Sequence, residues 1–393
     1  MNSMTSKERM LTSLRGGKPD HIPCSFMAFF NLHQQCPSEG EFLAKQVEMG
    51  LDAYAQVGYL EPSLHPEASE KTWTTREGKA TIFHRRIDTP KGPLTQQVVQ
   101  EEGWPQEGDF WRFNDWIVPR CREMLVKPEQ DLEKLPYLLG PFDKEHIRAL
   151  RESAKAARAM ADHHQVLLAG GWSSGNSLRG RGDDGVMGAD AMAWLSGYED
   201  IMVLSLTQPE IIREYARIIH EWNLKQLEIY LDVCDAELII RRAWYETTEF
   251  WTPAAYRTIL APFLKREVDL VHQAGRLLGL ITTSAFLPIL DDILDTGIDV
   301  LIGLDPEEGK GTNLVDVKAR FRAKGRALWG GVSGAITVEQ GTREETEQAV
   351  QRALDTLGPD GGFILSPVDN VRVDTPGTWD NTRALIEAWK RGR

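Results

Sequence analysis

The segments LLGLI (277–281), VLIGL (300–304), ALW (327–329) and GFIL (362–365) decide the fold of this sequence. Each is an apolar run that is too short for a helix and lacks the polar alternation of a half-exposed strand. Each therefore predicts a parallel strand that is buried on both faces. Polar, acidic or glycine residues follow every run, and helical segments separate the runs. In a barrel built from such units, the functional site lies at the carboxyl ends of the strands.

The rest of the chain supplies the remaining strands of such a barrel. Further apolar runs lie at 22–30, 52–57, 165–169 and 236–240. The helix predicted at 342–357 begins with Thr342 and has Glu345 three residues on, the pattern of a capping box. We therefore predict an α/β fold, a (β/α)8 TIM barrel, that uses residues 1–393 as a single domain.

Residues 65–141 differ from the rest of the chain in their pattern of polar and apolar residues. Polar and apolar residues alternate at 72–75, 81–87 and 94–99, as they do in antiparallel hairpins. We predict an inserted cap, placed between strands 2 and 3 of the barrel, that covers its mouth.

Composition excludes several classes of function. The net charge of −13 argues against a nucleic acid or an anionic membrane as the main partner, because both require a basic surface. The sequence contains no apolar run of about 18 residues and no signal peptide near its start, so we expect a cytoplasmic protein. The four cysteines show no paired spacing, which argues against disulfides and against a zinc site made of cysteines alone.

Polar and aromatic side chains gather at the predicted strand ends, where a desolvated polar group needs a partner. So many polar groups at buried strand ends indicate a ligand-binding site. They are Asn31, His33, Tyr59, Trp172, Asn176, Arg241, Trp244, Tyr245, Glu246, Thr283, Asp305, Glu307, Asp369 and Asn370.

Several of these residues carry a specific expectation beside a structural alternative. His33 is a candidate general acid or base, or else a histidine bonded to a loop. Glu246 and Glu307 are candidate proton carriers or metal ligands, or else helix caps. Arg241 or Arg242 is a candidate clamp for a substrate carboxylate, and one of the two is expected in a structural ion pair. Gly330 and Gly331 predict either a phosphate site or tight strand packing.

Taken together, these segments resemble the uroporphyrinogen decarboxylase superfamily, which includes that enzyme and the barrel methyltransferases of corrinoid-dependent methyl transfer. The resemblance spans nearly the whole chain and implies a (β/α)8 barrel. The matching segments are Ser6-Lys7-Glu8-Arg9, Leu14 to Asp20 with Ile22-Pro23, Leu328 to Gly331, Gly341-Thr342, Gly361 to Leu365, Asp374-Thr375-Pro376 and Asp380-Asn381.

The sequence departs from the motifs of the best-known members. Where uroporphyrinogen decarboxylases carry Arg-Gln-Ala-Gly-Arg, residues 27–34 contain no arginine, and their pyrrole-binding aspartate falls at Tyr59. The His-x-Cys zinc ligands of the family's methyltransferases fall at Ile281 and Thr283. Other members bind a metal through Glu and His, for which Glu246, Glu249, His33 and His272 are the candidates here.

Three functions remain open on this basis. The leading hypothesis is an enzyme that passes a methyl group from a small methylated compound to a corrinoid on a partner protein. In it Trp172, Trp244 and Tyr245 hold the substrate, and Glu246 or His33 protonates the leaving group. The alternative is a decarboxylase of an aromatic or pyrrole carboxylate, with Asp305 or Asp369 protonating the carbanion. The third is a non-catalytic binding barrel, and a homodimer fits all three.

Overall fold

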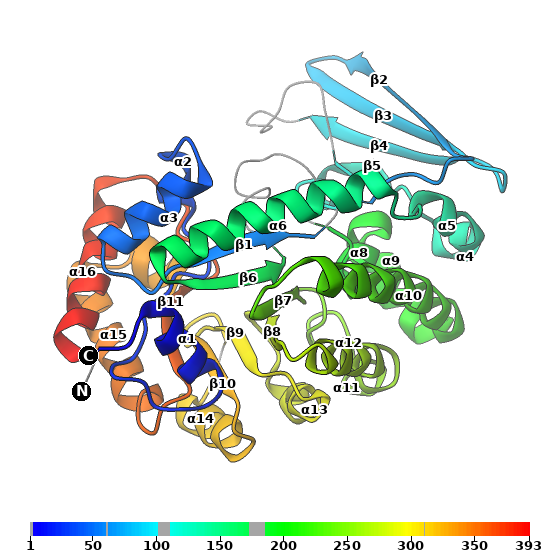
Figure 1. Cartoon of the computed structure of the whole chain (residues 1–393). Helices are drawn as coiled ribbons and strands as arrows, with labels where there is room; N and C mark the ends of the chain where they lie inside the picture. Colours follow the sequence, from blue (N-terminus) through cyan, green and yellow to red (C-terminus); the bar gives the residue numbers. More distant parts are fainter. Residues whose placement is uncertain (1–2, 60–61, 101–110, 173–184, 310) are drawn as a thin grey trace.

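The computed structural model describes residues 3–59, 62–100, 111–172, 185–309 and 311–393. It has a mixed α/β fold in which a curled, parallel, seven-stranded sheet is surrounded by helices (Figure 1). The order of strands in the sheet follows the order in the chain. The strands are β1 (Tyr54–Gly58), β6 (Leu167–Gly171), β7 (Leu238–Arg242), β8 (Leu277–Ile281), β9 (Val300–Leu304), β10 (Ala327–Ser333) and β11 (Phe363–Val368).

The prediction of a strand at 22–30 is wrong, because these residues form no regular strand. Only Cys24 forms a bridge, with Leu365 of β11, and Phe30 already belongs to a helix. Backbone hydrogen bonds join the segment to β11 only at Pro23 and Ser25, both to Leu365. Beyond them, side chains bond the backbone: Met27 N–H donates to Ser366 Oγ at 3.0 Å, and Met27 O accepts from Tyr54 Oη at 2.8 Å. The segment nevertheless lies between β11 and the residues that precede β1, so the arrangement is barrel-like.

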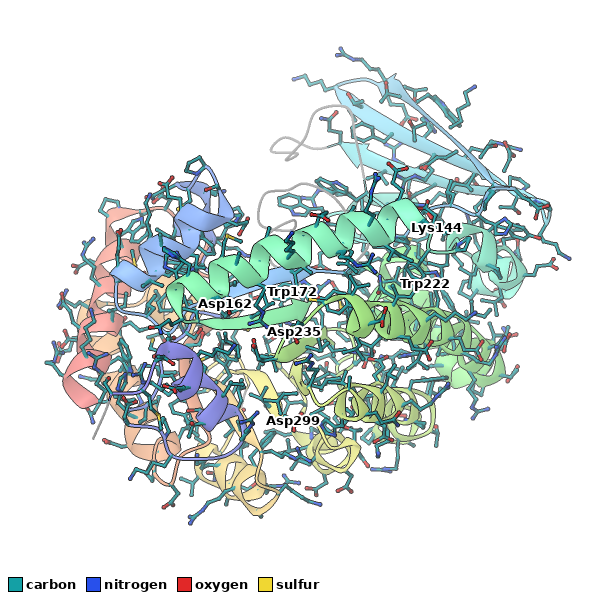
Figure 2. The ribbon with its side chains drawn as sticks, viewed as in Figure 1. Lys144, Asp162, Trp172, Trp222, Asp235 and Asp299 are labelled. Carbon is teal, nitrogen blue, oxygen red and sulfur yellow. The ribbon has the colours of Figure 1, made fainter. Side chains whose placement is uncertain are left out.

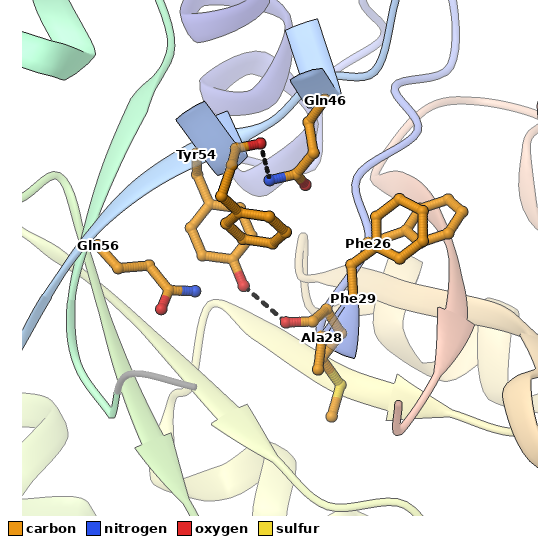
Figure 3. A pocket seen from close by; sticks show the side chains of 8 residues that line it. Phe26, Ala28, Phe29, Gln46, Tyr54 and Gln56 are labelled. Carbon is orange, nitrogen blue, oxygen red and sulfur yellow. Dashed lines mark hydrogen bonds between the residues drawn. The ribbon is translucent and has the colours of Figure 1, made fainter. Parts of the chain in front are cut away.

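A small cavity lies behind this segment, where Tyr54 and Gln46 turn towards it (Figure 3). Its volume is about 10 Å³, near the minimum that a single water molecule requires. Tyr54 Oη is bonded to Met27 O, and Gln46 Nε2 donates to Phe42 O at 3.3 Å. The cavity is too small to be a substrate site.

The helices lie outside the sheet, and the long ones bury one face against it, whereas all nine residues of α8 are buried. In α6, Leu150, Ala154, Ala157 and Ala161 are buried at helical spacing. The capping box at Thr342 and Glu345 is present at the start of α15. The helices are α1 (Ser6–Leu14), α2 (Phe30–Gln34), α3 (Glu39–Glu48), α4 (Pro128–Asp131), α5 (Leu135–Leu138), α6 (Lys144–His164), α8 (Gly188–Ser196), α9 (Tyr198–Thr207), α10 (Pro209–Val233), α11 (Pro253–Ala255), α12 (Ala261–Gln273), α13 (Leu290–Thr296), α14 (Leu314–Ala323), α15 (Arg343–Leu357) and α16 (Pro376–Gly392).

The inserted segment forms a separate antiparallel sheet of four strands, in the order β2-β3-β4-β5. These strands are β2 (Ser69–Glu77), β3 (Ala80–Asp88), β4 (Leu94–Gln100) and β5 (Cys121–Glu123). The predicted antiparallel pairing is present. The insertion follows β1, the first strand of the large sheet, because the segment at 22–30 contributes no strand. Helix α6 then runs from Lys144, on the side of the insertion, to Asp162 on the opposite side of the molecule (Figure 2).

The glycine pair of β10 serves close strand packing. The pairing of β10 with β9 shifts in register between Trp329 and Gly330. Gly330 has φ +147°, and a Cβ atom there would lie 2.7 Å from Leu304 O. A side chain is therefore excluded by the neighbouring backbone, which is the structural alternative expected from the sequence. Across the described ranges, none of the helices combines the length and the apolar character needed to span a membrane.

Candidate active site

A cleft of about 260 Å³ opens at the carboxyl ends of the strands. Residues that follow β7, β8 and β11 line it, together with one residue of the insertion. We call it the strand-end cleft, and its lining residues are Asp115, Arg242, Trp244, Tyr245, Glu249, Phe250, Thr283, Ser284, Asp369 and Arg372. Because parallel strands end at one edge of the sheet, residues far apart in the chain meet here.

Arg242 is fully buried at the base of the cleft and is covered by aromatic rings. Its guanidinium carbon lies 4.0 Å from the ring centre of Trp244 and 4.5 Å from that of Trp194. Its Nη2 donates to Asp115 Oδ2 at 2.6 Å, and its Nε lies 3.4 Å from Asp190 Oδ2. The arginine is therefore held between two carboxylates and a pair of tryptophans.

Asp115 connects the insertion to the strand ends. Besides Arg242, its carboxylate accepts from Trp194 Nε1 at 2.7 Å and from Tyr245 Oη at 2.8 Å. Burial opposes ionisation of this carboxyl, but the Arg242 charge and these donors outweigh it and lower the pKa of Asp115. Asp115 is thus ionised and fixes the position of Tyr245 in the cleft wall.

Asp190, at the start of α8, bonds the backbone of the loop after β7. Its carboxylate accepts from the backbone N–H of Tyr245 at 2.8 Å and of Trp244 at 3.3 Å. Burial, with the Glu246 charge, raises the pKa of Asp190 to about 6 against the opposing effect of Arg242. Asp190 therefore sets the orientation of the two aromatic residues that line the cleft.

Arg241 belongs to a buried ion network beneath the cleft. Its guanidinium forms a two-point contact with Glu246, at 2.8 Å for each pair of atoms, and its Nε donates to Glu267 at 3.0 Å. His220 Nδ1 lies 3.0 Å from the other oxygen of Glu267. Burial opposes ionisation of Glu267, but Arg241 and His220 outweigh it and lower its pKa to about 2. Of the two adjacent arginines, Arg241 is thus in a structural network, and only Arg242 reaches the cleft.

Asp369 is the carboxyl of the cleft that is best placed to carry a proton. It follows β11 directly, and its φ of +61° is a left-handed conformation that is costly for a residue with a side chain. Its side chain keeps 35% of its surface exposed, and its oxygen lies 3.7 Å from Arg372. Burial, with Asp115 and Glu339, raises the pKa of Asp369 although Arg372 and Arg242 oppose the shift.

The remaining predicted residues lie outside the cleft lining. His33 is buried in α2, with Nε2 2.8 Å from Glu39, and Tyr59 packs on the ring of Tyr230. Asn31 and Asn370 bond backbone groups between α2 and the segment after β11. Asp305 caps the turn at Glu307, whose side chain is 44% exposed. Asn176 lies outside the described residues.

Trp172 adjoins the cleft without lining it. Its ring meets that of Trp244 edge to face, with centres 5.6 Å apart, and it is buried at the end of β6. Its indole Nε1 is a buried donor with no hydrogen-bond partner among the residues that the structure describes.

The candidate metal ligands do not share a site. Both oxygens of Glu246 are bonded to Arg241, and His33 is bonded to Glu39. His272 bonds Asp299, which precedes β9 and so lies at the other end of the sheet from the cleft. Over the part of the chain that the structure describes, no three His, Cys, Asp or Glu side chains are grouped to hold a metal. These residues do not fit a zinc site.

Some lining residues carried no clear signal in the sequence. Asp115 lies in the insertion, 127 residues before its partner Arg242. Ser284, Arg372 and Phe250 follow predicted strand ends by three, seven and ten residues, and the last two are too far along for the strand end to indicate them. Asp190, which bonds the backbone of Trp244 and Tyr245 without lining the cleft, also carried no signal, because it does not follow a predicted strand.

Comparison with known proteins agrees with this geometry. Residues 189–392, more than half of the chain, match the family model described as uroporphyrinogen decarboxylase (URO-D). The chain belongs to the uroporphyrinogen decarboxylase family. In this family member the matched region includes all strands from β7 to β11, and so every lining residue of the cleft except Asp115. No curated protein matches the chain in sequence.

Solved structures also resemble this uroporphyrinogen decarboxylase family member. A methyltransferase from Methanosarcina mazei is 17% identical with a TM-score of 0.61, and the similarity covers 99% of each chain. This likeness shows a common fold. A B12-independent methionine synthase from Shewanella sp. W3-18-1 is 10% identical with a TM-score of 0.37, over 61% of this chain and 65% of the other.

Proposed function

We propose that this protein is a methyltransferase that removes a methyl group from a small neutral or cationic compound and passes it to a corrinoid carried by a partner protein. The substrate lies in the strand-end cleft, against Trp244, Tyr245 and Phe250. The observation that carries the proposal is that both arginines of β7 are already paired with carboxylates, whereas aromatic rings and acids line the cleft.

The pairing of the arginines argues against a carboxylate clamp made from β7. The charge of Arg241 is shared by Glu246 and Glu267, and that of Arg242 by Asp115 and Asp190. A substrate carboxylate would have to displace one of these acids from a buried partner, which is costly.

The acids of the cleft mouth favour a substrate that is not an anion. Glu249 and Asp369 both line the cleft. Burial raises the pKa of Glu308 nearby, and the charges of Asp305, Asp369 and Glu249 raise it further, so Glu308 lies in a negative environment. Aromatic faces beside carboxylates are the chemistry that recognises methylated ammonium groups. Methyl ethers would use the aromatic surface alone.

Asp369 is the proton donor in this proposal. When bound at the cleft, a reduced corrinoid would supply the electron pair that the methyl carbon accepts. The bond from the methyl carbon to its nitrogen or oxygen breaks, and its electrons stay on that heteroatom. The raised pKa of Asp369 keeps a proton available for the leaving heteroatom of an ether or a tertiary amine. A quaternary ammonium donor leaves as a neutral amine and needs no proton. The methyltransferase from Methanosarcina mazei, with the same fold, is consistent with this chemistry.

One observation favours decarboxylation as the second candidate. Arg372 lines the cleft and its side chain is 63% exposed, so it could bind a carboxylate that the β7 arginines cannot. In that case Asp369, at 3.7 Å from Arg372, would protonate the carbanion after loss of carbon dioxide.

Binding of ligand classes to the purified protein tests the proposal. We expect methylammonium compounds and aromatic methyl ethers to bind, measured by titration calorimetry, and aromatic and pyrrole carboxylates to bind more weakly. Glu249→Gln should weaken binding of the ammonium compounds by about twofold to fivefold, since an exposed ion pair contributes up to about 1 kcal/mol, and should leave the ethers unchanged.

Glu344→Gln is the matched control, because Glu344 is exposed on α15 and does not line the cleft. Tight binding of carboxylates, lost in Arg372→Gln, would favour the decarboxylase instead.

A further inference from the structure

The outer edge of the inserted sheet is a long, exposed strand. β2 has nine residues, and every one of them is exposed. It pairs only with β3 among the described strands and is the strand of the insertion farthest from α6 (Figure 1). Trp73 stands at its centre with 41% of its surface exposed, stacked on His84 with ring centres 5.0 Å apart. An open edge presents a row of backbone donors and acceptors to another strand.

The sequence of β2, SEKTWTTRE, is complementary to itself in the antiparallel direction. Two copies that cross at Trp73 pair all nine residues, which no other register of the two strands achieves. In this register Glu70 of each copy faces Arg76 of the other, so two opposite-charge pairs form by symmetry. A shift by one residue in one direction would place Lys71 opposite Arg76 and Glu70 opposite Glu77; a shift in the other direction would place Glu70 opposite Thr75 and so lose both opposite-charge pairs. Of these three registers, the centred one is therefore the only one with opposite-charge pairs.

The side chains of Glu70 and Arg76 are both accessible for such pairing. Glu70 bonds Arg85 of β3 at 2.5 Å and keeps 28% of its side chain exposed. Arg76 follows on the same face of the strand, six residues along and exposed. A facing Arg76 would add a second cation to Glu70 without displacing Arg85.

We propose that β2 pairs antiparallel with β2 of a second copy of this chain, centred on Trp73, so that the two inserted sheets join into one. The second copy is the partner because the charge pattern of the strand complements its own reverse. This inference is independent of the reaction in the strand-end cleft.

Cysteine cross-linking tests the register directly. Residues directly opposite on paired strands have Cβ atoms about 4.5–5.5 Å apart, within reach of a disulfide after a small adjustment. Trp73→Cys should therefore give a covalent dimer on mild oxidation, seen on a non-reducing gel. Lys71→Cys is the matched control, because in this register Lys71 faces Thr75 and two copies of residue 71 lie four residues apart. The unmodified protein, whose cysteines are free, measures the background.

The oligomeric state of the unmodified chain completes the test. We expect a dimer in analytical ultracentrifugation, a monomer for Arg76→Glu, and a dimer for Arg76→Lys, with unchanged circular dichroism in all three. A monomeric unmodified protein at micromolar concentration would overturn the proposal. So would equal cross-linking through residues 71 and 73, or a dimer that Arg76→Glu does not weaken.

Discussion

Replacement of Asp369 by Asn should lower kcat for transfer of the methyl group of an ether or a tertiary amine by about 10²–10⁴-fold, the usual range for loss of a general acid. The amide keeps the size of the side chain but has no acidic proton for the leaving group. Since Asp369 acts in its protonated form, kcat of the unmodified enzyme should fall as pH rises through its raised pKa. That limb of the pH profile should be missing in Asp369→Asn.

Two comparisons separate this role from a general loss of structure. Asp369→Glu should recover part of the activity, because the acid is restored on a longer side chain. Glu249→Gln, which also removes a cleft carboxyl, should change KM more than kcat. An unchanged kcat in Asp369→Asn with such donors would contradict the assignment of the proton donor.

Replacement of Arg241 by Leu should lower the free energy of unfolding by about 3–5 kcal/mol, the cost of breaking a buried ion pair from one side. Arg241 is 2% exposed and is shared by Glu246 and Glu267, which are buried as well. Without the cation, both carboxylates would remain buried and lack their main partner. Urea unfolding followed by circular dichroism measures the change.

Arg217→Ala is the control for this prediction. Arg217 also pairs with two glutamates, Glu214 and Glu221, but its side chain is 46% exposed on α10. Its loss should cost less than about 1 kcal/mol, because water screens an exposed pair. Similar losses in the two variants would mean that the Arg241 network does not stabilise the fold more than a surface pair does.

The apolar runs predicted the sheet well because strands buried on both faces require continuous apolar sequence. The same reasoning brought Trp244, Tyr245, Thr283 and Asp369 to one place, since the carboxyl ends of parallel strands meet. It failed at residues 22–30, which are largely apolar and buried but form backbone bonds with β11 only around Cys24, while Met27 bonds the side chain of Ser366. Burial and strand geometry are separate properties, and hydrophobicity reports only the first.

The pairing of charges could not be predicted from sequence. His33 lies beside Glu39 and Glu246 is paired with Arg241, and neither His33 nor Glu246 lines the cleft. The sequence alone does not show these partners. The role of Asp115 could not be predicted either. It lies in an insertion whose docking onto the strand ends depends on contacts made 127 residues later in the chain.

The most direct test of methyl transfer to a corrinoid is to identify which compounds in a mixture the protein converts. The purified protein would be incubated with methylammonium compounds, aromatic methyl ethers, and aromatic and pyrrole carboxylic acids, with and without reduced corrinoid, and the products identified by mass spectrometry. We predict that methylated compounds lose a methyl group only when the corrinoid is present, and that the acids stay intact. Loss of carbon dioxide from the acids without corrinoid, while the methylated compounds stay unchanged, would contradict the account.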